Sequence, residues 1–197
     1  ASTDRTAELA EANGARVVSV HKRQIAATRN AGARAAMGDV FIFIDADTLA
    51  PGDTVKAALE AIEGGAVAGG AQVRFDGKVS WLAQAWTRFF MEVFSVLKLA
   101  PGCFMYCTRQ AFDGAGGYDE RYFASEEVWF SKALKQQGKF VMLRRPVITS
   151  GRKIRDHGTP RLLWKMAMFL FRGPGQLQKR EGLELWYDGR RESVDQR

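Results

Sequence analysis

The sequence has 197 residues, which suits one α/β domain with a sizeable core, and its 46% hydrophobic and 26% charged residues are the balance of a globular protein. The longest apolar run, 81–101, is interrupted by Arg88, Glu92 and Lys98, which excludes a membrane-spanning segment there. The formal net charge of +7 favours anionic partners such as nucleotide diphosphates, nucleic acid or acidic lipid headgroups.

Secondary structure in the first half is predicted from hydrophobic period and from turn residues. Residues 7–10 begin a helix that Gly14 stops, and the valines of 16–20 predict a short strand. An alanine-rich helix is expected over 24–37. The apolar run 39–44 that follows is typical of a strand covered on both faces. A helix over 53–62 and a strand over 66–75 come next.

The second half continues the alternation. It predicts a long amphipathic helix over 79–99, a strand over 103–107, a helix over 126–136, a strand over 140–143 and a basic, aromatic helix over 161–171. Strands that alternate with helices predict an α/β sheet, and no linker divides the chain. Because such a domain usually starts with its central strand, we expect the first strand of the sheet to be missing from this sequence.

Asp45-Ala46-Asp47 at the end of the apolar strand is the sharpest chemical signal. Ligands of open α/β sheets bind beyond the carboxyl ends of the strands. Two carboxylates placed there can hold Mg²⁺ or Mn²⁺, with substrate phosphates in the remaining positions. The same pattern also suits a turn or a helix cap, because Asp is common after strands. After so apolar a strand we favour the metal site.

Glu126 and Glu127 follow Gly116-Gly117-Tyr118-Asp119-Glu120 and open a predicted helix. Acids are favoured at a helix N-terminus by the macrodipole alone. The functional interpretation makes one of the two glutamates a general base that takes a proton from a hydroxyl group.

A basic loop follows the last predicted strand, over 149–158. Its cations, which include Arg152 and Lys153, can clamp phosphates, and the loop can close over a bound nucleotide. The alternative is a solvated basic loop. His157 is more often a surface side chain than a ligand, and it is kept as a weak third metal ligand.

Five segments in order resemble glycosyltransferase family 2. Thr3-Asp4-Arg5-Thr6 is similar to the end of its DGSTD motif, and Arg29-Asn30-Ala31-Gly32 to its ARNxG helix start. The run 38–47 resembles its strand into DxD, 116–120 its GGFDE segment, and 125–127 its xED site. Each motif is weak alone, but their order and spacing over about residues 2–158 are fairly specific.

The resemblance implies a single GT-A domain over 1–197, a Rossmann-like, mostly parallel sheet with helices on both faces, with 159–197 as a basic, aromatic helical extension. It implies an inverting transfer of sugar from a UDP- or GDP-sugar to an acceptor hydroxyl. Asp4, Arg29, Asp45, Asp47, Arg152 and Lys153 would bind the donor, with Asp45, Asp47 and His157 on the metal. Glu127 would be the catalytic base, with Glu126 beside it.

Two features depart from the family. The first strand and most of the base-binding motif are absent, so the donor pocket is incomplete in these residues. The base position holds Glu where the family has Asp, and the extra methylene displaces the carboxylate by roughly a bond length, which matters at near-attack distances.

Two other functions compete with catalysis. The helices over 79–99 and 161–171 suit a non-catalytic protein that binds a membrane surface, although packing in the core explains most of their apolar residues. A nucleic-acid binder ranks low, because no recognised module is present. Cys103 and Cys107, if both lie on one strand, are too far apart to pair. We therefore expect a cytoplasmic location, with peripheral contact at the inner face of the membrane and an acceptor that includes lipid-linked molecules.

Overall fold

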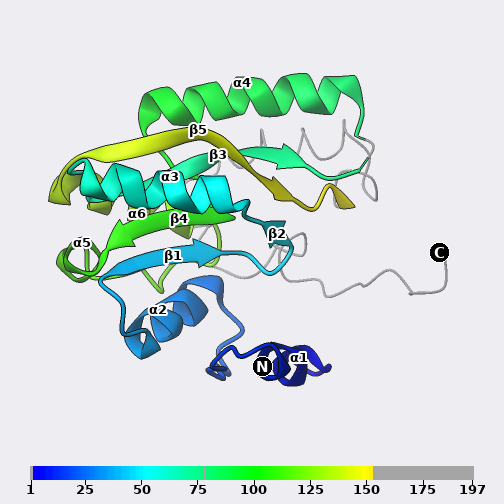
Figure 1. Ribbon diagram of the computed structural model, residues 1–197, viewed down its shortest axis with the longest axis vertical. Helices are drawn as coiled ribbons and strands as arrows, with labels where there is room; N and C mark the ends of the chain where they lie inside the picture. The colour runs from blue at the N-terminus through cyan, green and yellow to red at the C-terminus, as the bar shows by residue number, and fades with distance from the viewer. Residues whose placement is uncertain (1, 78, 153–197) are drawn as a thin grey trace.

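A computed structural model describes residues 2–77 and 79–152 of the chain. Helices and strands alternate along it as Figure 1 shows. In chain order they are α1 (Thr6–Ala12), α2 (Ile25–Ala35), β1 (Val40–Ile44), β2 (Thr48–Leu49), α3 (Gly52–Glu63), β3 (Ala68–Phe75), α4 (Trp81–Leu97), β4 (Phe104–Thr108), α5 (Arg109–Gly114), α6 (Glu126–Gln137) and β5 (Phe140–Thr149).

The described strands form one sheet in the order β1-β4-β3-β5-β2. β3 and β5 pair in parallel, whereas β4 is antiparallel to both β1 and β3, and β2 is antiparallel to β5. Three strands, β1, β3 and β5, therefore run in one direction, and β4 and β2 oppose them. The expected α/β sheet is confirmed. It is mixed, because β4 and β2 run antiparallel to the other three strands.

The sheet is covered on both faces, as expected, because successive side chains of a strand point to opposite sides. Phe41 and Phe43 of β1 pack with α2, α5 and α6 on one face. Ile42, between them, packs on the other face with the apolar side of α3, which lies across the sheet in Figure 1. Two cores thus hold β1 from both sides and fix the position of its carboxyl end.

The centre of the sheet requires a residue without a side chain. Gly69 of β3 lies between Tyr106 of β4 and Val141 of β5. The Tyr106 hydroxyl donates a hydrogen bond to the Val141 carbonyl (2.9 Å), and a Cβ at Gly69 would overlap both groups. This arrangement joins the three central strands on one face.

One expectation differs from the structure, and one helix was not predicted. Residues 16–20 form no strand, because within the described chain no other strand pairs with them and valine propensity alone cannot satisfy backbone groups. The segment after β4 is helical: the Thr108 hydroxyl accepts from the Ala111 N–H (3.1 Å) and starts α5. The extension 159–197 and its helix over 161–171 lie outside the described residues.

The helix expected over 79–99 is confirmed as α4. Ser80 caps it by accepting a hydrogen bond from the Ala83 N–H (3.2 Å), and Lys98 ends it in a left-handed conformation. Within 2–77 and 79–152, none of the helices combines the length and the apolarity that crossing a bilayer requires.

Candidate active site

The turn after β1 presents the two aspartates at the carboxyl end of that strand. The Asp45 N–H donates to the Cys103 carbonyl (3.2 Å), and the Asp45 carbonyl accepts from the Thr48 N–H (3.0 Å), which closes a tight turn. The Asp47 side chain is exposed, while its carbonyl accepts from the Ser150 N–H (3.1 Å). Both ends of the turn are therefore fixed, and the Asp47 side chain is left exposed at it.

A single guanidinium joins this turn to the second acidic pair. Arg29 of α2 donates from Nη2 to Asp45 Oδ1 (2.8 Å) and from Nη1 to Glu126 Oε1 (2.7 Å). Nη2 also donates to the Gly102 carbonyl (2.7 Å). Only 10% of the Arg29 side chain is exposed. Arg29 of α2 thus contacts three other parts of the chain: the turn after β1, the loop at Gly102 and the start of α6.

The charge states in this cluster support one another. Burial alone would lower the pKa of Arg29, but its surroundings, which include the charges of Glu126 and Asp45, outweigh burial, so the pKa is raised. Burial raises the pKa of Glu126, and the Arg29 guanidinium opposes that rise. An ion pair buried in this way is costly to break, because removing one partner leaves the other charge without compensation.

Glu127 differs from its neighbour. Its side chain is partly buried and lies beside the Cα of Gly102, where an added Cβ would meet it at 3.6 Å. Burial, and then the charge of Glu126, raise the pKa of Glu127 to about 8. A carboxylate with a raised pKa is a stronger base, which is the property that a proton acceptor needs near neutral pH.

The start of α6 orients both glutamates. Ser125, just before them, has a left-handed backbone (φ 59°), a conformation that costs free energy in a non-glycine residue and is frequent at functional sites. One turn further on, the buried Ser131 hydroxyl accepts a hydrogen bond from the Ala100 N–H (3.1 Å). The loop that carries Gly102 is therefore fastened to the same helix as Glu127.

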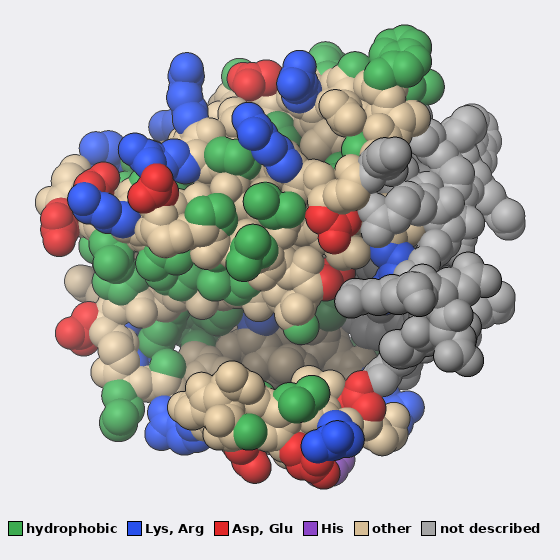
Figure 2. All heavy atoms as spheres, turned by 45° about the vertical axis from the view of Figure 1, so that its right-hand side comes forward, with side chains coloured by type: hydrophobic (Ala, Val, Ile, Leu, Met, Phe, Trp, Pro, Cys, Tyr) green, Lys and Arg blue, Asp and Glu red, His purple; other side chains and the backbone are tan. Residues whose placement is uncertain are grey.

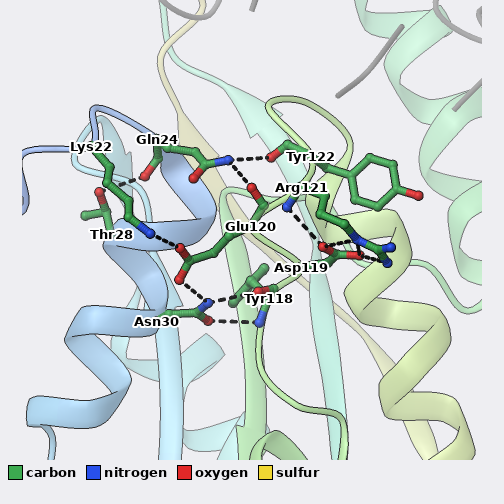
Figure 3. Close-up of polar contacts among 9 residues, drawn as sticks. All are labelled: Lys22, Gln24, Thr28, Asn30, Tyr118, Asp119, Glu120, Arg121 and Tyr122. Atoms are coloured by element: carbon green, nitrogen blue, oxygen red, sulfur yellow. Dashed lines mark hydrogen bonds and ion pairs between the residues drawn. The ribbon is translucent and has the colours of Figure 1, made fainter. Parts of the chain in front are cut away.

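The segment 116–120 is held against α2, the helix that carries Arg29. Figure 3 shows the Asn30 amide of α2 between the backbone groups of Tyr118: it donates to the carbonyl (2.8 Å) and accepts from the N–H (2.8 Å). Asn30 also donates to Glu120 Oε1 (3.1 Å), and the other carboxylate oxygen of Glu120, Oε2, pairs with Lys22 Nζ (2.6 Å). The loop that leads into α6 is thereby attached to α2.

The other candidate residues lie apart from this cluster or outside the described chain. The Asp4 carboxylate accepts from the N–H and hydroxyl of Thr6 at the start of α1. Arg152 is half-buried just past β5, where Gly151 donates its N–H to the Asp76 carboxylate (2.7 Å). Lys153 and His157 lie outside the described residues.

The aspartates fit a divalent cation that is shared with phosphate. The described residues engage only one carboxylate oxygen of Asp45, through Arg29, and none of them holds the Asp47 carboxylate. Within 2–77 and 79–152, no three His, Cys, Asp or Glu side chains gather as a complete metal site. Mg²⁺ and Mn²⁺ bind in such places with one or two carboxylates, with phosphate oxygens and water completing the shell.

Sequence patterns missed the loop 101–103. Gly102 and Cys103 contribute only backbone carbonyls, to Arg29 and to the Asp45 N–H, and such contacts leave no residue-type signal. The Pro101-Gly102 pair indicates a turn, but nothing local places that turn against residues 73 positions earlier in the chain.

Comparisons with known proteins support the mixed α/β architecture. The fold matches the GT-A fold, as a solved structure with that fold shows. The sequence model of glycosyl transferase family 2 matches residues 1–114, more than half of the chain. The protein therefore belongs to glycosyltransferase family 2. Curated protein sequences gave no significant match.

Two solved structures are similar in fold. One is a mannosyltransferase from Pyrobaculum calidifontis in complex with GDP-mannose and Mn²⁺, with a TM-score of 0.60 and 20% identity over 88% of this chain and 53% of its own. The other, a mycobacterial protein, has a TM-score of 0.47 and 19% identity over 76% of this chain and 52% of its own. The chain thus spans about half the length of both structures.

Proposed function

We propose that this protein transfers a sugar from a nucleotide-diphosphate donor to an acceptor hydroxyl group, with inversion at the anomeric carbon. One observation carries the proposal: Arg29 holds Asp45 and Glu126 on the same guanidinium, with Glu127 beside the loop that shares this contact. The aspartates suited to the donor diphosphate and the acid suited to the acceptor are thereby assembled at one place.

The donor side is formed by the turn after β1. Asp45 and Asp47 would hold Mg²⁺ or Mn²⁺, which when bound supplies positive charge against the leaving diphosphate. Arg152 follows Ser150 and Gly151, whose N–H groups donate to Asp47 and Asp76. With Lys153 it would stabilise the same diphosphate. The Mn²⁺ and GDP-mannose bound to the similar mannosyltransferase favour a GDP-sugar over a UDP-sugar.

The acceptor side depends on Glu127. Its carboxylate takes the proton of the acceptor hydroxyl as the acceptor oxygen forms a bond to the anomeric carbon. The bond between that carbon and the donor diphosphate breaks in the same step, and the electron pair leaves with the diphosphate. Glu126 stays paired with Arg29 and supports Glu127 from the neighbouring position. The raised pKa of Glu127 favours this proton transfer.

Calorimetry with GDP and Mn²⁺ tests the donor site. We expect Asp47→Ala to weaken nucleotide binding that requires metal by more than about 100-fold, because the variant loses a metal ligand. Asp39→Ala is the matched control, since it removes an exposed aspartate at the opposite end of the same strand. Equal binding by the wild type and Asp47→Ala would refute the assignment.

A further inference from the structure

The outward face of α4 is mostly apolar, with Gln84, Arg88 and Glu92 as its exposed polar residues, which is the reverse of what a helix at a protein surface usually shows. Of its 17 residues only Ala83 is buried. Trp81 is 79% exposed, Phe89 59% and Val96 80%. Figure 2 shows hydrophobic side chains at the top of the molecule, where Figure 1 places α4. A helix that is apolar on its outer side needs a partner of its own.

The exposed residues form one stripe. Trp81, Ala85, Phe89 and Val96 are exposed and, with the half-buried Val93, recur at intervals of four and three residues, which places them on one side of the helix. The one acid of this side, Glu92, accepts a hydrogen bond from Gln72 (3.4 Å). Beside this stripe the Trp86, Phe89 and Phe90 rings lie 5.2–6.0 Å apart and form a cluster. Tryptophan and phenylalanine at such density are typical of helices that lie in a lipid interface.

Cations border the stripe at both ends. A groove between the end of β3 and the first half of α4 carries Arg74 and Arg88, and its described lining includes no acidic side chain. At the other end, Lys98 follows the last turn, and Lys135 of α6 donates to the Leu97 carbonyl (2.9 Å). These charges are placed to meet anions while the apolar side chains between them are buried.

We propose that the α4 face (residues 81–97 with Arg74, Lys98 and Lys135) docks on an anionic lipid bilayer surface. The aromatic and aliphatic side chains enter the boundary between headgroups and acyl chains. The four cations lie at the level of the lipid phosphates. A surface for another protein would not need this pairing of an apolar stripe with cations at both ends. The docking does not depend on the proposed sugar transfer.

Vesicle flotation tests the proposal. Vesicles of phosphatidylcholine with and without phosphatidylglycerol are incubated with the wild type and with the double variant Trp81→Glu/Phe89→Glu. We expect the wild type to float with the anionic vesicles, and the double variant to partition at least about tenfold less. Leu9→Glu/Met37→Glu is the matched control, because these side chains are 56% and 84% exposed and lie outside α4. The control should float as the wild type does.

Three outcomes would overturn the proposal. The wild type does not bind anionic vesicles, or both double variants bind as well as the wild type, or light scattering shows that the α4 variant loses self-association instead. Circular dichroism confirms that each variant is folded. Binding of GDP and Mn²⁺, measured on the same preparations, should be equal in all of them, so a failure of the donor site is distinguished from a failure of docking.

Discussion

At the scale of single residues, the two adjacent glutamates have different surroundings. Glu126 is held by Arg29, whereas Glu127 lies beside Gly102 and shares a side-chain hydrogen bond with Glu126. Because Glu126 is paired with Arg29 and the proposed base is Glu127, a conservative substitution at each position should have different effects.

We expect Glu127→Gln to bind donor nucleotide normally but to transfer sugar at least about 100-fold more slowly, because the amide cannot accept the proton. Single-turnover transfer from a nucleotide sugar, with donor affinity measured separately, provides the check. Turnover near the wild-type rate would place the base elsewhere.

The same substitution should change how stability depends on pH. Burial raises the folded pKa of Glu127 to about 8, above the value near 4.3 in an unfolded chain. Between these values the folded state binds more protons, so wild-type stability falls as the pH rises. Glu127→Gln removes this titration. Its melting temperature relative to the wild type should therefore rise between pH 5 and pH 8, by about 2–4 °C for each kcal/mol of this contribution that the wild type loses. A constant difference across that range, measured by scanning calorimetry, would contradict the assigned burial.

At the scale of elements, α2 acts as the support on which the site is built. Arg29 and Asn30 are consecutive, and each reaches a different distant segment: the first the acidic residues and the second the loop 118–120. The motif Arg29-Asn30-Ala31-Gly32 therefore has a structural reason, since both polar side chains satisfy groups of other elements.

Removal of the Asn30 amide should destabilise the protein. Asn30→Ala leaves the Tyr118 N–H and carbonyl without partners in a buried place, and we expect a loss of about 2 kcal/mol or more in the free energy of unfolding. Lys22→Ala, which breaks an exposed ion pair to Glu120, should cost less than about 1 kcal/mol. Urea unfolding of both variants gives the comparison. Equal losses would show that the Asn30 hydrogen bonds to Tyr118 contribute no more than the exposed ion pair.

Local patterns predicted the elements and the acidic residues, but not the contacts between them. The run 39–44 and Asp45 follow one another in sequence, so both the strand and its acidic end could be predicted. The use of Arg29 could not, because its partners lie 16, 73 and 97 positions away and are brought to it only by the sheet order. The strand expected over 16–20 is wrong for a similar reason: strand formation depends on a partner, which valine content does not supply.

At the scale of the whole molecule, the two cores meet at a sheet whose centre has no room for a side chain. Gly69→Ala should cost more than about 3 kcal/mol or prevent folding, because the new methyl group overlaps the Val141 carbonyl and the Tyr106 ring. Gly32→Ala is the contrasting variant, since nothing lies within 4 Å of its added Cβ in α2, and it should gain about 0.5–1 kcal/mol. Thermal unfolding of the pair measures both effects. Similar melting temperatures would show that the sheet centre can relax.

The sharing of Arg29 limits how the protein can be redesigned. An exchange of the β1 turn, of α2 or of the start of α6 for a segment without the matching charged side chain would leave the remaining charges of the cluster without compensation. Chimeras that exchange one of these segments should therefore express poorly, whereas chimeras that exchange all three together should remain folded. Changes of donor preference would best be sought outside this trio.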